Sequence, residues 1–365
     1  EGAEIAGTVH CTVAIGRIKR NNRMRYGLDA LAKELGHEKS KEVEEYIATH
    51  KLYRFEPGDD DDTPDKVPEF SRVPFELICR YACKDARLSF LIGTHQRAKI
   101  LATTQPVRPL EPVFRNELAL TPVLFQMERT GVLINREYVE AGLTRERARA
   151  EEIREQFAKL TGVEFIDSAK CLAPVFDKLG EHYTFTATGR PSFTADSLDG
   201  MKTPVASMVR EHRDALKRAN TYYKNFLYYA DAQNRIHLDM RQGGTLTGRL
   251  SAAHPNLQNL TQAKDKAAEY PVRRSFIPAP GFFFGFLDFD QMEYKLMLER
   301  AKQMDLIELV KNGLDVHQAT ADLMGVDRTT SKTLNFMLLY GGGIAKLCQA
   351  LFAPTLPLET LKALG

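Results

Sequence analysis

The sequence predicts an α+β fold, with helices over most of its length and strands only after residue 230. Three observations support this. Hydrophobic residues make up 43% and charged residues 27% of the 365 residues, as in ordinary globular proteins. Several segments have helical periodicity between turn residues, and two later segments have the pattern of strands. A chain of this length is expected to form two or three domains.

Helices are expected in the first part of the chain. Residues 22–36 read as a helix that ends at Gly36, and residues 74–96 as a long helix with a proline at its start. Between them, residues 56–65 hold six acids and no base. This favours a solvated loop, because adjacent aspartates on a loop rarely converge on one metal ion. A group of prolines then marks a domain boundary: Pro106, Pro109 and Pro112.

More helices are expected after this boundary. Residues 114–131 read as a helix that ends at glycine, and a long charged helix runs from about Arg136 to Leu160. Residues 168–217 read as short helices between polar turns.

Two strands are expected in the second half. Residues 235–240 alternate between polar and apolar, as a strand does. Residues 282–288 (FFFGFLD) read as a buried strand, because they are too hydrophobic to be exposed on either face. From Gln291 onward the chain is expected to be mainly helical.

The net charge of +2 does not by itself indicate a nucleic-acid partner, but charge gathers locally. Residues 207–250 hold eight Lys or Arg against four acids, and they include Tyr222, Tyr223, Tyr228 and Tyr229. Basic residues among aromatics can follow a phosphate backbone. A solvated amphipathic helix is the alternative, and charge alone favours it slightly.

The five cysteines are scattered and contain no CxxC pair, which argues against a disulfide framework or a zinc site and indicates reduced thiols. The sequence has no secretory signal and no run near the about 18 apolar residues of a membrane span. We therefore expect a cytoplasmic protein without a membrane partner. Because residue 1 is Glu, we also expect an incomplete reading frame or a processed piece.

The segment 281–301 holds the first candidate site. A buried strand is expected to end at Asp288, and a helix with Glu293 in its first turn follows at once. A carboxylate at the end of a core strand is costly unless a cation or hydrogen-bond donors compensate for it. The arrangement suits metal-assisted phosphoryl transfer. An equally supported alternative makes Asp288 a helix N-cap.

The segment 328–343 predicts a helix with a functional stripe. Arg328, Lys332, Phe336 and Tyr340 follow at intervals of four and share one face. Two cations can neutralise a triphosphate, and an aromatic ring one turn further can stack on a base. Three glycines end the helix. Taken alone, the segment is explained better by a mixed surface stripe.

The segment 245–260 is polar and rich in turn residues, so it reads as a loop. Its donors could bind base edges in a minor groove or phosphates: Arg249, Asn256, Gln258 and Asn259. A plain loop is the alternative.

In this order and spacing, the three segments resemble family A DNA polymerases, the type of bacterial DNA polymerase I and of bacteriophage replicative enzymes. Residues 247–259 match TGRLSxxxPNLQN, and residues 328–341 match RxxxKxxxFxxxYG. Between them, Asp288, Gln291 and Glu293 match the DxxQxE core of the first palm motif. Upstream, the YACKD segment matches the YxxxD motif of the 3′–5′ proofreading exonuclease.

The resemblance implies a catalytic centre with two Mg²⁺ ions. Asp288 would bind both ions, together with the backbone carbonyl of Phe289, and Lys332 would also be catalytic. Glu293 would exclude the ribose 2′-hydroxyl and so select deoxynucleotides. The other contacts to the incoming nucleotide would come from Gln291, His317, Arg328, Phe336 and Tyr340, besides Lys332. An ordinary surface histidine is the alternative for His317.

The resemblance also implies contacts to primer–template DNA. They would come from Lys217, Thr247, Arg249, Asn256, Gln258 and Asn259. For Asn256 and Gln258 the alternative is hydrogen bonding within the loop. In the exonuclease remnant, Asp85 would be a metal ligand and Tyr81 a water-orienting phenol on the same helix face.

The implied architecture is a right-hand polymerase fold, preceded by the C-terminal part of a ribonuclease H-like 3′–5′ exonuclease domain. A partial exonuclease domain would span residues 1–105 and a thumb region 106–206. A partial palm would span 207–301, and truncated fingers 302–365. The short insertion before Arg328 leans toward phage-like enzymes.

Parts of each active site are missing. The family's second metal-binding aspartate belongs to a His-Asp-Glu motif, and no such tripeptide occurs in the sequence. Residues 1–73 contain no DxE motif of the exonuclease. Losing one charge pair, worth about 4 kcal/mol at roughly 4 Å and an effective dielectric of about 20, lowers a rate by about 10³. The isolated chain is therefore expected to be nearly inert.

The expected function is DNA-templated DNA synthesis, with primer–template DNA and deoxynucleoside triphosphates as partners. A second polypeptide or a missing C-terminal segment would complete the enzyme. The alternative is a non-catalytic DNA-binding remnant or one half of a split polymerase. A proofreading-type nuclease is a third class, supported only by Tyr81 and Asp85.

Overall fold

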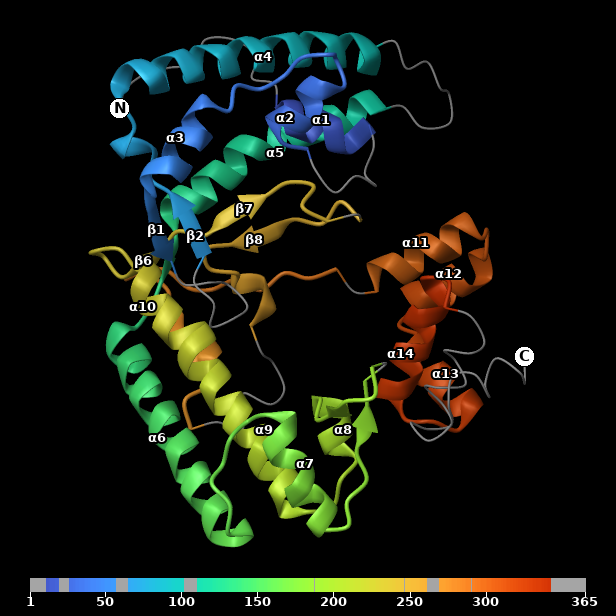
Figure 1. Cartoon of the computed structure of the whole chain (residues 1–365). Coiled ribbons are helices and arrows are strands. Elements are labelled where there is room, and N and C mark those ends of the chain that lie inside the picture. The colour runs from blue at the N-terminus through green and yellow to red at the C-terminus, as the bar shows by residue number, and fades with distance from the viewer. Residues whose placement is uncertain are drawn as a thin grey trace. The chain divides into compact units, whose positions relative to one another are not determined.

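The computed structural model describes residues 11–19, 26–56, 65–101, 110–186, 188–245, 247–260, 269–289 and 291–342. Contacts divide the chain into two compact units, Glu1–Phe283 and Phe284–Gly365, here the N-terminal and C-terminal units. Both are mainly helical, and the strands of the described residues are short and pair two by two (Figure 1). The expected α+β composition is confirmed.

The N-terminal unit begins with three helices that contact the long helix α4, Phe75–Leu101. Apolar side chains of α2 and α4, among them Leu31 and Ile92, form a small buried core between them. The helix expected over 74–96 is confirmed and is longer. The helix expected over 22–36 is shorter, and residues 22–25 lie outside the described residues. The three helices are α1 (Thr12–Lys19), α2 (Leu28–Lys33) and α3 (Glu42–His50).

A β-hairpin that the sequence did not predict joins α3 to α4. β1 (Tyr53–Glu56) pairs antiparallel with β2 (Asp65–Pro68), and the 3-10 turn η1 (Phe70–Arg72) follows. The acidic segment was expected to be a loop, and residues 57–64 of it lie outside the described residues.

Two long helices come next, as expected. α5 (Leu110–Thr130) ends before Gly131, whose φ of 62° favours glycine. α6 (Arg136–Thr161) begins at the N-cap Asn135, whose Oδ1 accepts a hydrogen bond from the backbone N of Tyr138 at 3.0 Å.

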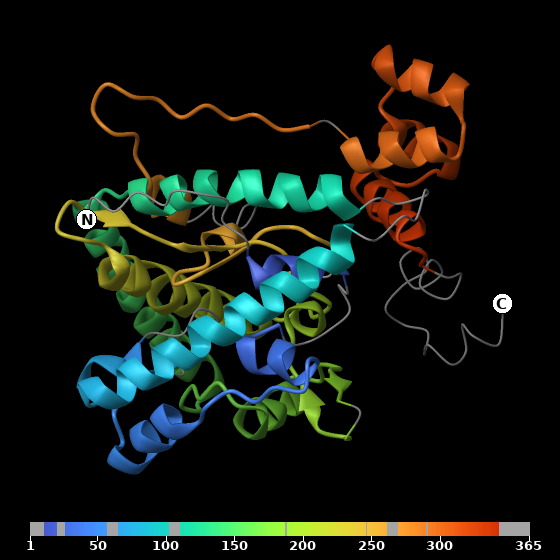
Figure 2. The ribbon, with the colours of Figure 1, turned by 90° about the horizontal axis from the view of Figure 1, so that it is seen from above.

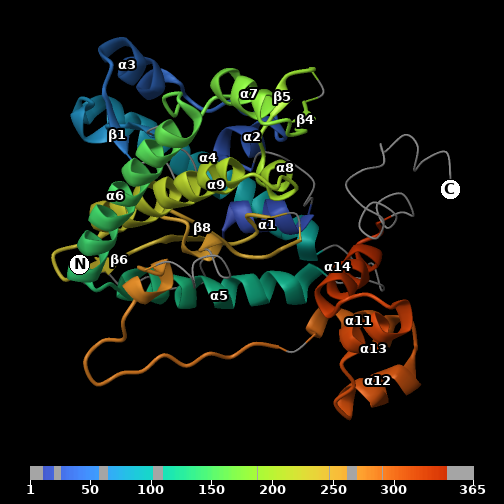
Figure 3. The same cartoon turned by 90° about the horizontal axis from the view of Figure 1, so that it is seen from below.

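Beyond α6, short helices surround an aromatic core that includes Phe157, Phe176 and Phe193. This confirms the short helices expected over 168–217, but the hairpin β4–β5 was missed. α9 continues through the π-helix η2 into α10 and packs along α6 (Figure 3). The elements are α7 (Ala169–Lys178), β4 (Thr184–Phe185), β5 (Pro191–Ser192), α8 (Ala195–Asp199), α9 (Pro204–Leu216), η2 (Lys217–Lys224) and α10 (Asn225–Tyr229).

The strand expected over 235–240 is divided between two small sheets. β6 (Arg235–Ile236) pairs with β3 (Val132–Leu133), and β7 (Asp239–Arg241) pairs with β8 (Ser251–Ala253). The backbone leaves the first sheet at His237, and therefore one alternating segment serves two partners. The 3-10 turns η3 (Leu257–Asn259) and η5 (Val272–Ser275) follow β8.

The prediction of a buried strand over residues 282–288 is wrong. The segment is an extended ribbon without strand pairing (Figure 2). Its side chains are exposed, with 90% of Phe286 and all of Leu287 accessible. A strand is buried only when neighbouring strands and a covering layer are present, and among the described residues no strand pairs with this one.

From Gln291 onward the described part of the C-terminal unit is mainly helical, as expected. α11 and α12 pack together, as do α13 and α14, and Leu298, Val310 and Val316 form a small core. The helices are α11 (Met292–Arg300), α12 (Met304–Lys311), α13 (Val316–Met324) and α14 (Arg328–Leu339).

Candidate nucleic-acid and nucleotide site

The segment 245–260 forms the tip and return strand of the β7–β8 hairpin and the turn η3. Asn256 is half-buried, and its Oδ1 accepts a hydrogen bond from the backbone N of Gln258 at 3.1 Å, which begins the turn. The alternative of hydrogen bonding within the loop is therefore seen for the Asn256 side chain. The other expected DNA contacts of this segment are exposed: Thr247, Arg249, Gln258 and Asn259.

The basic stretch 207–250 is partly neutralised. Several of its arginines form ion pairs with carboxylates: Arg213 with Asp167, Arg218 with Glu146, Arg210 with Asp199 and, at 3.8 Å, Arg241 with Asp239. Tyr222 and Tyr223 are buried in an apolar core and do not form a stacking surface for bases. The amphipathic helix therefore explains most of this pattern, while Lys217 remains exposed at the start of the π-helix.

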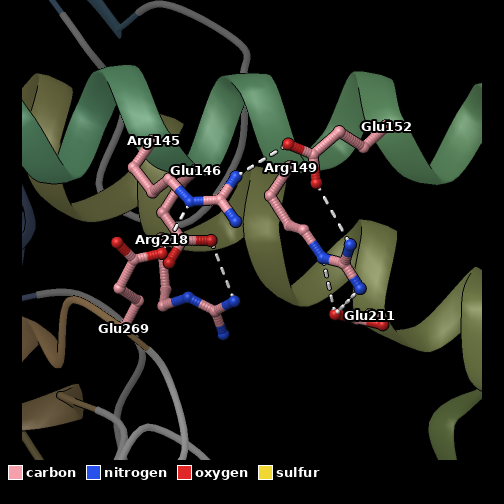
Figure 4. Close-up of polar contacts among 7 residues, drawn as sticks. All are labelled: Arg145, Glu146, Arg149, Glu152, Glu211, Arg218 and Glu269. Atoms are coloured by element: carbon pink, nitrogen blue, oxygen red, sulfur yellow. Dashed lines mark hydrogen bonds and ion pairs between the residues drawn. The ribbon is translucent and has the colours of Figure 1, made fainter.

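A charged network joins α6 to α9, to the π-helix and to the segment before η5 (Figure 4). Glu146 is only 4% exposed, and its carboxylate lies 2.9 Å from the guanidinium of Arg218, itself 13% exposed. The surrounding pairs are more exposed, so removing one partner of the Glu146–Arg218 pair is expected to destabilise the fold more than removing a partner of those pairs. The other members are Arg145, Arg149, Glu152, Glu211 and Glu269.

The segment that resembles the first palm motif lies in the C-terminal unit. Asp288 is exposed in the extended segment, and Glu293 lies in the first turn of α11. The N-cap of α11 is Gln291, with a φ of 50°, so the N-cap interpretation of Asp288 is wrong. Among the described residues no three His, Cys, Asp or Glu side chains are grouped to hold a metal ion. The described residues do not by themselves form a site for two Mg²⁺ ions.

The helix α14 carries the expected stripe. Its N-cap Asp327 accepts hydrogen bonds from the backbone N atoms of Thr329 and Thr330. Lys332 is exposed. The rings of Phe336 and Tyr340 stack at the other end, with centroids 6.4 Å apart and planes 19° from parallel. One helix therefore presents cations in its first turns and two parallel rings in its last.

Arg328, at the start of this stripe, forms a hydrogen bond with Asp315, the N-cap residue of α13. Its guanidinium Nε lies 2.8 Å from Oδ2 of Asp315, whose Oδ1 accepts hydrogen bonds from the backbone N atoms of His317 and Gln318. The side chain of Arg328 is still 50% exposed. The Arg328 hydrogen bond is the main reason why the pKa of Asp315 is lowered.

His317 is not the surface histidine that was the alternative. It is 3% exposed, and its Nδ1 lies 3.0 Å from Nδ2 of Asn335 on α14. Its ring lies beside that of Phe336, with centroids 5.6 Å apart. His317 therefore packs against the aromatic end of the α14 stripe.

Tyr81 and Asp85 lie on one face of α4, as the spacing predicted, but a lysine occupies the space beside them. The Lys39 ammonium lies 2.5 Å from the Tyr81 hydroxyl, 2.8 Å from Glu44 and 3.8 Å from Asp85. Burial acts to lower the pKa of Lys39, but hydrogen bonds to Glu44 and Tyr81 outweigh it, so the pKa is raised. A fixed cation, not a metal site, is what the described residues place beside Asp85.

Sequence reasoning missed the partners of these side chains. Asp315 could have been recognised, because it directly precedes an apolar helical run, as N-caps do. Lys39 and Glu146 gave no such signal, because Tyr81 and Arg218, with which they form hydrogen bonds, are 42 and 72 residues away.

The comparisons agree with the motifs. The model of DNA polymerase family A matches residues 136–357. DNA polymerase DpoZ of Salmonella phage PMBT28 is 26% identical over 95% of this chain and 59% of its own length. DNA polymerase I of Pseudomonas aeruginosa is 29% identical over 92% of this chain and 37% of its own length. The chain thus spans about three fifths or less of these relatives.

A solved structure shares the fold. The POL domain of Pol1 from M. smegmatis, in complex with DNA primer-template and dNTP, superposes with a TM-score of 0.69 at 22% identity. The match covers 96% of this chain and 57% of that one. Among the residues described here, no helix has the length and apolar character needed to cross a membrane. With a family model that matches more than half of its residues, this chain belongs to DNA polymerase family A.

Proposed function

We propose that this chain takes part in DNA-templated DNA synthesis, in which deoxynucleotides are added to a primer 3′-hydroxyl. The observation that carries the proposal is the stripe on α14, where exposed Lys332 precedes the stacked rings of Phe336 and Tyr340. Cations in this position suit a triphosphate, and a flat ring suits a base. The structural relative was solved with DNA primer-template and dNTP, which supports the same partners here.

In the proposed reaction the primer 3′-oxygen attacks the α-phosphorus of the incoming nucleotide. A new oxygen–phosphorus bond forms, and the bond from the α-phosphorus to the bridging oxygen breaks, so that pyrophosphate leaves. Lys332 and Arg328 stabilise the charge on the phosphates. The base of the incoming nucleotide lies beside Phe336, Tyr340 and His317. Glu293 excludes the ribose 2′-hydroxyl, and Gln291 lies beside the sugar.

We propose Mg²⁺ as the cofactor, because oxygen-rich phosphoryl-transfer sites favour this ion. Asp288 and the backbone carbonyl of Phe289 would be its ligands from this chain. The duplex would be held by Lys217, Thr247, Arg249, Asn256, Gln258 and Asn259. The division into a partial exonuclease domain, a thumb region, a partial palm and fingers, with boundaries near 105, 206 and 301, is part of the same proposal.

One observation favours the alternative of a non-catalytic DNA-binding remnant or one half of a split polymerase. The described residues around Asp288 are exposed, and among the described part of the chain no complete site for two ions is formed. A second polypeptide or a further segment would then supply the remaining carboxylate. In either case, we propose that the 365 residues by themselves bind primer–template DNA but extend it at most very slowly.

The test is a native gel with a labelled primer–template whose primer ends in a dideoxynucleotide. We expect the chain to shift the duplex, and Mg²⁺ with the complementary dNTP to stabilise the complex more than a mismatched dNTP does. Lys332→Ala should remove that difference. Duplex binding with no effect of dNTP would favour the DNA-binding alternative, and absence of duplex binding would contradict both.

Primer extension separates the complete enzyme from the partial one. We expect the isolated chain to give at most trace extension of an ordinary primer. Rapid extension that is abolished by Asp288→Ala would show that the 365 residues hold a complete active site.

A further inference from the structure

The base of the loop that carries Thr247 and Arg249 is fixed by Gln242, the residue directly after β7. The Gln242 side-chain Nε2 donates to the Glu117 carboxylate at 2.8 Å and to the Glu117 backbone carbonyl at 2.7 Å. Its Oε1 accepts a hydrogen bond from the Thr121 hydroxyl at 2.9 Å. The amide of one side chain is therefore bound at both ends to α5.

A second helix holds the same residue from another side. Arg17 of α1 donates through Nη1 to the backbone carbonyl of Gln242. Its aliphatic part lies against Gly243, where an added Cβ would be 2.8 Å from Cδ of Arg17. Gly243 has a φ of 58°, so both its conformation and its surroundings favour glycine. Helices α1 and α5 thus define where the loop begins.

The loop is also braced between this point and Arg249. The last pair of the hairpin joins Arg241 to Ser251, and at Gly244 an added Cβ would be 1.9 Å from the Ser251 hydroxyl. The Thr245 hydroxyl donates to the backbone carbonyl of Arg249 at 3.1 Å. A displacement of Gln242 would therefore pass to Arg249 along the backbone between Gln242 and Thr245 and through the hydrogen bond from the Thr245 hydroxyl.

We propose that Glu117 and Gln242 are positioning residues that hold Thr247 and Arg249 in place for duplex DNA. This inference rests on the proposed function, and it adds two residues that lie outside the motifs of the sequence. A loop held in one conformation before binding loses less conformational entropy when it binds. Glu117 acts through Gln242 and does not itself touch DNA.

The negative charge of Glu117 allows a positioning role to be distinguished from a simple electrostatic effect on duplex binding. Replacing Glu117 by Ala removes a negative charge, which by long-range attraction alone would strengthen binding to DNA. The inference predicts the opposite: Glu117→Ala weakens duplex binding by about fivefold or more, because the loop is no longer held. Glu111→Ala is the matched control, since Glu111 lies on the same helix, has the same charge and, among the described residues, pairs with exposed Arg115. It should leave affinity unchanged or slightly higher.

The experiment measures the affinity of the whole chain for a labelled primer–template duplex by fluorescence anisotropy, with Arg249→Ala and the double variant included. If Glu117 acts through the loop, Glu117→Ala adds less than about twofold to Arg249→Ala, since coupled residues are not additive. Glu117→Gln, which keeps an acceptor for Gln242, should restore affinity, and Gln242→Ala should repeat the defect. Thermal unfolding of each variant reports any loss of fold.

Two outcomes overturn the inference in distinguishable ways. If Arg249→Ala weakens binding while Glu117→Ala and Gln242→Ala behave like Glu111→Ala, the positioning role is wrong and the proposed function stands. If the unaltered chain does not bind the duplex, or Arg249→Ala binds as well as it, the proposed DNA contact fails and the positioning role fails with it.

Discussion

The guanidinium of Arg328 and the carboxylate of Asp315 form an ion pair, with Nη2 of the arginine 2.8 Å from Oδ2 of the aspartate. The same aspartate caps α13, so one carboxylate joins the beginning of that helix to the beginning of α14. Asp315 therefore both orients the proposed phosphate ligand Arg328 and partly neutralises it. Lys332, one turn further, is exposed.

The first prediction concerns the pH dependence of Asp315. Its pKa is lowered by the Arg328 hydrogen bond and then by the backbone N of Gln318. A lowered folded-state pKa contributes stability above the unfolded value that is lost as pH falls through the folded value. We expect Asp315→Asn, which keeps a capping side chain, to flatten the loss of stability below about pH 4. Thermal unfolding at several pH values measures this, with exposed Asp305→Asn as the control. If Asp315→Asn loses as much thermal stability at acid pH as the unaltered chain does, the prediction is wrong.

The second prediction concerns the buried pair of Glu146 and Arg218 (Figure 4). Glu146→Gln leaves the arginine buried without its counter-charge, and we expect a loss of about 3 kcal/mol of unfolding free energy. The matched change Glu152→Gln removes a 46% exposed partner of Arg145 and Arg149 and should cost less than about 1 kcal/mol. Urea unfolding measures both. Equal losses in the two variants would show that burial does not set the strength of this network.

The third prediction concerns His237, which connects two segments. Its ring nitrogens lie 2.7 Å from the Glu128 backbone carbonyl and 3.1 Å from the Asp231 carboxylate. These contacts, Glu128 first, raise the pKa of His237. A raised folded-state pKa gives stability that is complete below the unfolded value of about 6.5 and is lost as pH rises through the folded value. His237→Gln should remove this decline, as measured by urea midpoints from acid to alkaline pH. Exposed His182→Gln should retain it.

The fourth prediction concerns Tyr222, whose buried hydroxyl donates to the backbone carbonyl of Asn259 at 3.0 Å. Tyr222→Phe keeps the ring in the core and leaves that carbonyl without this donor. We expect a loss of about 1 kcal/mol in stability and weaker duplex binding, because η3 is held less firmly. Exposed Tyr228→Phe is the control for both measurements. If Tyr222→Phe binds the duplex with unchanged affinity, the hydrogen bond that holds η3 does not contribute to DNA binding.

Sequence periodicity predicted the long helices well. Helices α4, α5 and α6 each have strong start or stop signals, such as Pro74 before α4 and Gly131 after α5. Their existence depends on local patterns that are complete within about 25 residues. The hairpins β1–β2 and β4–β5 were missed, because strands of two to four residues are too short to show alternation.

The segment 282–288 shows where prediction from local sequence patterns fails. Its composition predicts a buried strand, but burial depends on partner strands that a segment does not itself encode, and Phe286 is 90% exposed. The site residues likewise divide into those that a local motif identifies and those that only tertiary contacts identify. The motifs identified Arg249 and Arg328, whereas Gln242 and Glu117 emerge only from contacts across the fold. The specific roles of the site residues remain predictions.

The proposal that this hairpin holds the duplex is tested most directly by photo-cross-linking of the chain to a primer–template that carries 5-iodouracil near the primer terminus, followed by mass spectrometry of the attached peptides. We expect attached peptides within residues 245–260, where Thr247, Arg249, Gln258 and Asn259 are exposed. Cross-links confined to other surfaces, such as α7 or α12, or the absence of any cross-link, would contradict the proposal that this hairpin holds the duplex.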